Sequence, residues 1–187
     1  GGAAYSWSDL STSRWASLPT SQTLSADYSA GTGQIFGEVG YDIQAGKVGF
    51  QPFAGLAYVN LHTDAFTETG GAAALTSASD TTSVSYTTLG VRASADFVLG
   101  TLLARADGMV GWRHAFGDVT PETSYTFAAG GAPFTVEGVP IGENSFLLDL
   151  GLSAWAHNGV SVGVAYSGEF ASDASDQSVS GNVSWTF

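Results

Sequence analysis

The chain has 187 residues, which is room for one domain, and only 12% of them are charged although 44% are hydrophobic. Its formal charge of −12, with five Lys and Arg residues in total, argues against nucleic acid as a partner, because phosphate binding needs clustered basic side chains. No stretch reaches the roughly 18 apolar residues of a membrane-spanning helix, and the chain has no cysteine for disulfide bonds.

This composition favours a membrane protein. A water-soluble chain with so few charges would expose large apolar patches, whereas lipid favours an apolar exterior. Because no helix of sufficient length is available, we expect the chain to cross the bilayer with β-strands.

The first three predicted strands are residues 3–14, 34–43 and 47–61. A long polar connection at residues 13–26 separates the first two, and a tight turn at residues 44–47 joins the second and third. Pro52 lies in the third strand and interrupts its hydrogen-bond ladder, since proline has no backbone N–H.

The next two predicted strands, residues 89–97 and 102–113, show a period of two. In the first of them, large apolar residues alternate with residues that include Arg92 and Asp96. Leu99-Gly100 forms the tight turn between them.

The last three predicted strands are residues 146–154, 160–170 and 178–187, with a tight turn at Asn158-Gly159. In the final strand, one face is apolar and the other is small and polar. Its apolar face carries Val179, Gly181, Val183, Trp185 and Phe187.

Tight turns therefore alternate with long connections, which we place at residues 13–26, 63–82, 117–142 and 172–176. This alternation is typical of outer-membrane barrels, with tight turns on the periplasmic side and long loops outside. We predict one all-β domain over residues 1–187, a transmembrane antiparallel up-and-down β-barrel of about eight strands. Open edges in lipid leave backbone groups unpaired, so either residues 3–11 pair with residues 179–187 to close a small barrel, which we favour, or other chains cap both edges.

Several stretches resemble one known family. They are residues 34–41, 52–58, 111–118, 164–176 and 183–187. They are similar to the C-terminal translocator barrel of autotransporters, the type V secretion proteins of Gram-negative bacteria. The resemblance implies a twelve-strand barrel, of which this chain holds the C-terminal two-thirds and lacks the first strands and the pore helix.

The resemblance also implies location and partners. The chain would lie in the bacterial outer membrane, surrounded by lipid or, once purified, by detergent. It would be covalently linked to a passenger in the parent protein, and the terminal Phe187 would be an assembly signal for the barrel-assembly machinery.

Charged residues fall on the less apolar face of the predicted strands, where we expect them to line the lumen. They are Glu38, Arg92, Arg105, Asp107, Arg113, Asp149 and Glu169, with Asp42 as a weaker member. A charge on the lipid face would cost about 2–4 kcal/mol near the midplane. Two interpretations stay open: a hydrated path for a translocating chain, or an ion-pair network that fills the barrel. An eight-stranded barrel closed by this chain alone would be plugged by its own side chains.

Enzymatic signals are weak. His62, His114 and His157 have no metal-ligand spacing, and no Gly-x-Ser-x-Gly sequence is present. Self-cleavage by Glu38, Asp149 or Glu169 is not expected, because the segment to be cut is absent. We predict no enzymatic activity, no cofactor and no metal. The alternatives are an outer-membrane hydrolase or a small adhesin-like barrel acting through its extracellular loops.

Overall fold

A computed structural model describes residues 1–17, 21–156, 159–172 and 174–185. Those residues include no helix with the length and apolar character needed to span a bilayer. Three residues discussed above, His157, Asn158 and Phe187, lie outside the described residues.

Eight long strands make up most of the described chain. They are β1 (Gly2–Ala16), β2 (Gln22–Gly40), β4 (Val48–Thr63), β7 (Asp80–Leu99), β8 (Leu102–Gly117), β11 (Asn144–Trp155), β12 (Val160–Ala171) and β13 (Ser175–Trp185). Five short strands complete the set: β3 (Ile43–Ala45), β5 (Phe66–Thr67), β6 (Leu75–Ser77), β9 (Glu122–Phe127) and β10 (Phe134–Glu137).

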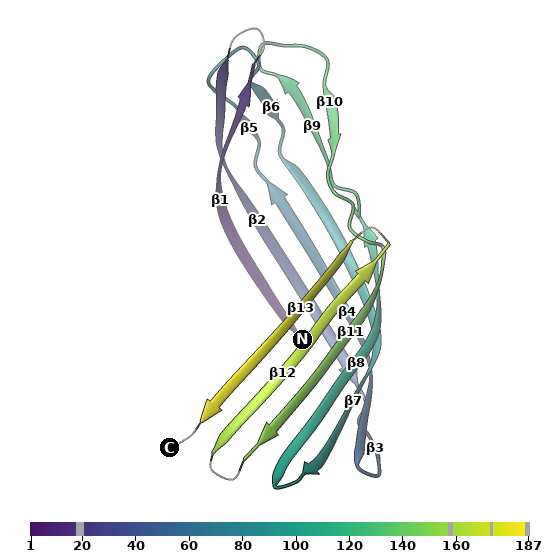
Figure 1. Cartoon of the computed structure of the whole chain (residues 1–187). Helices are drawn as coiled ribbons and strands as arrows, with labels where there is room; N and C mark the ends of the chain where they lie inside the picture. Colours follow the sequence, from purple (N-terminus) through teal and green to yellow (C-terminus); the bar gives the residue numbers. More distant parts are fainter. Residues whose placement is uncertain (18–20, 157–158, 173, 186–187) are drawn as a thin grey trace. The chain divides into compact units, whose positions relative to one another are not determined.

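The long strands form one sheet in the order β1-β2-β4-β7-β8-β11-β12-β13, with β3 paired to β4 (Figure 1). Each long strand follows its neighbour in the sequence, and the pairs β1–β2, β8–β11, β11–β12 and β12–β13 are antiparallel. The prediction of an all-β antiparallel meander with about eight strands is confirmed. Pairing of residues 3–11 with residues 179–187 stays a prediction.

The tight turns fall where the sequence predicts two of them. Gly46 and Gly100 have φ angles of 65° and 63°, a left-handed conformation that glycine adopts without steric cost. These turns join β3 to β4 and β7 to β8. The strand ends connected by these tight turns are called the turn ends below. The opposite strand ends are called the loop ends.

The chain divides into two compact units. The first contains Gly1–Phe36, Ala57–Ser85 and Phe116–Ile141, and the second contains Gly37–Leu56, Tyr86–Ala115 and Gly142–Phe187. Each is described by itself below.

In the second unit, the strand register separates a polar face from an apolar face. Asp149 lies opposite Met109 on β8 and Ser167 on β12, so the odd-numbered residues of these three strands share the polar face. Ser178 of β13 pairs with Ser167 and continues it. The apolar face carries large side chains that are 45–75% exposed: Val110, Trp112, Phe146, Leu150, Leu152, Val162, Val164, Val179, Val183 and Trp185. Exposed apolar side chains on one whole face are what contact with lipid requires.

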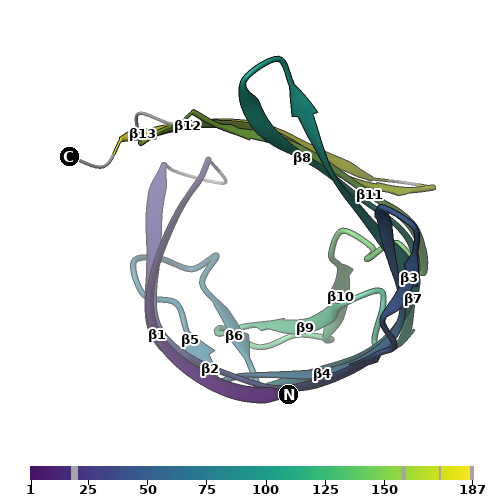
Figure 2. The ribbon, with the colours of Figure 1, turned by 90° about the horizontal axis from the view of Figure 1, so that it is seen from below.

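In the first unit, the predicted long loops are more ordered than the sequence indicates. The prediction of a loop at residues 13–26 is wrong, because β1 continues to Ala16 and β2 begins at Gln22. The connections near residues 63–82 and 117–142 contain β5, β6, β9 and β10, which form a second sheet in the order β10-β9-β6-β5. Figure 2 shows this sheet on the concave side of β1 and β2. We call that side the inner face of the hairpin.

Candidate functional site

The seven charged residues that the sequence places in the lumen all lie in the second unit, and each makes an ion pair or a hydrogen bond there. They come from five strands: Glu38 from β2, Arg92 from β7, Arg105, Asp107 and Arg113 from β8, Asp149 from β11, and Glu169 from β12. Their role in lining a closed lumen stays a prediction.

Arg92 links three neighbouring strands. Its Nη1 and Nη2 atoms donate to the two carboxylate oxygens of Glu38 at 2.7 and 2.8 Å, a two-pronged ion pair between β7 and β2. Nη1 also donates to Oε1 of Gln51 on β4 at 3.0 Å, and Gln51 in turn donates to Asp42 at 2.8 Å. The guanidinium therefore fastens β4 between its two neighbours.

Arg92 also packs on an aromatic ring. Its guanidinium carbon lies 3.8 Å from the centre of the Phe53 ring, and Phe53 is buried. The ring occupies the space beside Gly90, where an added Cβ would lie 2.6 Å from Phe53 Cζ and 2.7 Å from the carbonyl oxygen of Val110. Gly90 thus lets the ring lie flat on the sheet under the arginine.

Arg105 has a looser arrangement. Its Nε donates to Oδ1 of Asp107 on the same strand at 2.8 Å, and its Nη1 lies 3.8 Å from Oδ1 of Asp96 on β7. All three side chains are substantially exposed. The shorter contact of Arg105 therefore lies within β8, and its contact with β7 is long and exposed.

Arg113 and Glu169 join β8 to β12 across β11. Nη1 of Arg113 donates to Oε2 of Glu169 at 2.8 Å. Leu147 on β11 lies opposite both Gly111 and Glu169, and it is buried on the polar face. The ion pair therefore spans the strand that carries the buried leucine.

Two cavities connect these clusters within the second unit. A cavity of about 720 Å³ is lined by Asp42, Arg92, Arg105, Asp107 and Asp149, among others. A smaller cavity of about 210 Å³ is lined by residues that include Arg113, Glu169 and Asp149. Asp149 accepts a hydrogen bond from Ser167 at 2.7 Å and borders both cavities.

This arrangement is suited to a hydrated polar surface. Glu38, Asp107 and Glu169 are each engaged by an arginine, and Asp149 accepts from a hydroxyl. The described residues contain no group of three or more metal-ligating side chains.

The described histidines lie apart from these clusters. His62 Nδ1 is 2.9 Å from Oγ1 of Thr81, and its Nε2 is 3.6 Å from Oδ1 of Asp64. His62 and Asp64 are both at least half exposed. Among the described contacts, Thr81, His62 and Asp64 are the only set that brings a hydroxyl, an imidazole and a carboxylate together, and this set is open to water. His114 stacks on Trp112, and both contact Oδ1 of Asn144.

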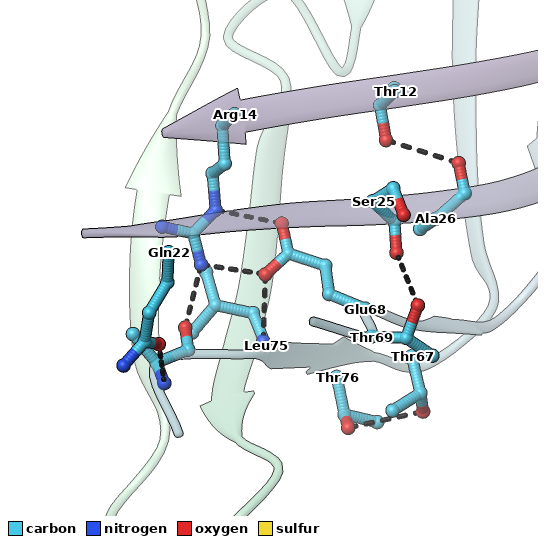
Figure 3. A network of polar contacts seen from close by, with 11 residues as sticks. Thr12, Arg14, Gln22, Ser25, Ala26, Thr67, Glu68, Thr69, Leu75 and Thr76 are labelled. Atoms are coloured by element: carbon cyan, nitrogen blue, oxygen red, sulfur yellow. Dashed lines mark hydrogen bonds and ion pairs between the residues drawn. The ribbon is translucent and has the colours of Figure 1, made fainter. Parts of the chain in front are cut away.

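Sequence reasoning missed a fourth arginine, in the first unit. Arg14 on β1 makes a two-pronged ion pair with Glu68, which lies between β5 and β6 and is only 9% exposed (Figure 3). The hydrogen bonds from Arg14 hold the pKa of the Glu68 carboxyl below its usual value. The two residues are 54 positions apart, and no local pattern indicates that they meet.

An antiparallel meander with an exposed apolar face and an ion-paired polar face defines a membrane-barrel protein. The profile of the family described as "Autotransporter beta-domain" matches residues 1–167. Two proteins of Serratia marcescens, each named "Extracellular serine protease", are 32% identical to this chain over all 187 residues. The chain spans 18% of the length of each of these relatives.

The chain belongs to the autotransporter β-domain family. It therefore forms part of a translocator β-barrel, and the resemblance carried by the motifs in the sequence is confirmed.

Proposed function

We propose that this chain lies in the bacterial outer membrane, where it anchors and exports a passenger joined to it in the parent protein. The observation that carries the proposal is the division of the second unit into two faces. Large exposed apolar side chains occupy one face, which suits lipid, and ion pairs with half-exposed side chains occupy the other, which suits water. A polar, hydrated face offers an exported polypeptide no apolar surface to adhere to.

The lengths of the relatives support a covalently linked passenger. Each is named an extracellular serine protease, and most of each relative lies outside the part that matches this chain. In the second unit, Glu38, Asp107 and Glu169 are each ion-paired with an arginine, which supports a structural role for these carboxylates. We therefore assign any catalytic activity of the parent to the passenger.

Deleting the 187 codons from the parent gene tests export. Cells carrying the intact gene should release or display the passenger outside the cell, and the deletion should retain it in the envelope. The passenger is followed with an epitope tag in the medium, on intact cells and in membrane fractions. Equal passenger outside the cell with both genes would refute the proposal.

Incubating the purified chain with ester, lipid and peptide substrates tests the enzyme alternative. We expect no turnover. Turnover that disappears in a His114→Ala variant would replace the translocator assignment with a hydrolase.

The barrel-assembly machinery is the second proposed partner, through Phe187. Phe187 lies outside the described residues, and the proposal rests on the resemblance of residues 183–187 to autotransporter barrels. Deleting it should lower insertion in cells while leaving refolding into detergent largely intact. Equal loss in both assays would make Phe187 a packing residue.

A further inference from the structure

The segment of residues 64–79, between β4 and β7, docks along the loop end of β2. Ser25 and Thr69 exchange two backbone hydrogen bonds of 3.0 and 2.8 Å, and the N–H of Asp64 donates to the carbonyl of Ser29 at 3.0 Å. Tyr28 stacks on Phe66 with ring centres 4.5 Å apart. Because β6 pairs with β9, and β9 with β10, the second sheet is continuous with this docked segment.

An ion pair between Arg14 and Glu68 ties the docked segment to β1. Arg14 Nε and Nη2 donate to the two carboxylate oxygens of Glu68 at 2.7 and 2.6 Å, and Nη2 also donates to the carbonyl of Ala73 at 2.7 Å (Figure 3). Glu68 in addition accepts the backbone N–H of Leu75 at 2.8 Å. Two side chains thus make four hydrogen bonds that tie β1, the docked segment and β6 together.

Apolar contacts accompany the ion pair, since Ala26 and Ala74 are buried and the Phe66 ring also lies 6.3 Å from the ring of Tyr125. Leu24 lies beside Arg14 in the register of β1 and β2, and it is the only side chain of the described residues that is large and fully buried. At Gly70, φ is 112° and an added Cβ would lie 2.1 Å from the carbonyl oxygen of Thr23, so backbone touches backbone there. Arg14–Glu68 is the only ion pair that the described residues form between the segment and the hairpin, and its carboxylate is buried. It therefore adds a charge-assisted contact to the apolar and backbone contacts that hold the segment.

We propose that the Arg14–Glu68 pair is a latch. When it is closed, the segment of residues 64–79 and the second sheet built on it stay docked on the inner face of the β1–β2 hairpin. When it is broken, the segment leaves that face while the strands of the second unit keep their pairing. Removing Arg14 leaves the buried Glu68 carboxylate without a counter-charge, and replacing Glu68 by a neutral residue leaves the Arg14 guanidinium without its ion-pair partner.

Hydrogen exchange on the purified 187-residue chain in detergent tests the latch. Glu68→Gln and Arg14→Met should each speed exchange in residues 64–79 at least about tenfold, the factor expected for losing a hydrogen bond between charged groups. Exchange in β11 and β12 should not change. Exchanging the two residues, Arg14→Glu with Glu68→Arg, should restore part of the protection.

Asp27→Asn is the matched control, because Asp27 accepts a hydrogen bond from Ser11 on the opposite face of the same hairpin. It should leave residues 64–79 as protected as in the wild type. The latch is refuted if Glu68→Gln exchanges as slowly as the wild type, or if it speeds residues 64–79 and β11–β12 by the same factor.

A removable cross-link keeps the test decisive if Glu68→Gln alone fails to fold. Ser25 and Thr69 are directly opposed, and the chain has no other cysteine, so Ser25→Cys with Thr69→Cys can hold the segment during refolding. Reduction should then speed exchange in the Glu68→Gln background and have little effect with Glu68 intact. An equal response to reduction in both backgrounds would overturn the latch.

Discussion

The loop end of the β1–β2 hairpin and the strands β11 to β13 distribute their polar side chains in opposite ways. On the hairpin, Asp9 and Asp27 accept hydrogen bonds from serines on the outer face, while the inner face holds buried Leu24. On β11 to β13, the apolar side chains are exposed on one face and the ion-paired groups occupy the other. The hairpin end is built like a sheet in water, and β11 to β13 are built like a sheet in lipid.

Strand length agrees with this difference. A tilted strand needs about 9–11 residues to cross a bilayer. The strands β11, β12 and β13 have 12, 12 and 11 residues, whereas β1 and β2 have 15 and 19. The Ser11–Asp27 pair of the outer face lies in the part of β1 and β2 toward the loop end.

The largest effect should come from a charge on the lipid face of the second unit. Val164→Arg should destabilise the chain by about 2–4 kcal/mol, because the guanidinium would have to enter lipid near the middle of β12. Refolding into lipid vesicles, measured as the folded fraction against urea, checks the value.

Ala165→Arg is the matched control, one residue further along the same strand. Ala165 borders the larger cavity on the polar face, so the new side chain has space and carboxylates nearby. Equal losses for the two variants would mean that the two faces of β12 do not differ in environment.

In the first unit, protonating Glu68 should have the next largest effect. Because the pKa of Glu68 is lowered in the folded state, its ion pair stabilises fully above the ordinary glutamate pKa and loses this contribution as the pH falls through the lower folded value. We expect protection of residues 64–79 to fall by about 1.5–3 kcal/mol over that acidic window, measured by hydrogen exchange after correction for intrinsic rates. The Glu68→Gln variant should show no such pH dependence, and a wild type without it would contradict the shift.

The same contrast explains what could be predicted from the sequence. The alternation in β11 to β13 is visible because lipid and water impose one residue class on each face. At the loop ends of β1 and β2, polar residues such as Asp9, Ser11 and Thr12 interrupt the apolar side chains, so the sequence there shows no clear period of two and resembles a loop. The second sheet was missed for the same reason, since its strands are short and rich in Thr and Ser.

For the charged residues, the sequence predicts the face of the sheet but not the ion-pair partner. Which face a charged residue occupies follows from the period of two, and Arg92, Arg113 and Glu169 lie where that period puts them. Which carboxylate pairs with which arginine depends on strand register and on partners such as Phe53 and Leu147. Register is set by contacts across strands that no local pattern contains.

A smaller effect is expected from filling the space beside Phe53. Gly90→Ala should cost about 1–3 kcal/mol, because the new methyl group meets a buried ring on one side and the backbone oxygen of Val110 on the other. Gly37→Ala is the control, since an added Cβ there has no neighbour within 4 Å. Equal urea midpoints for the two variants would show that Phe53 moves aside without strain.

The smallest effect should come from Arg105→Gln. Arg105 pairs with Asp107 on its own strand, so the contact adds no link between strands, and Asp96 is 3.8 Å away with its side chain largely exposed. Water and salt ions can replace such a partner, and we expect no measurable change in the urea midpoint of refolding. Arg113→Gln in the same strand should lower the midpoint, because the Arg113–Glu169 pair joins β8 to β12 across the strand that carries buried Leu147. If Arg105→Gln proved as damaging as Arg113→Gln, the larger cavity would have to exclude water, and the polar face of the second unit would be a packed interior instead of a hydrated surface.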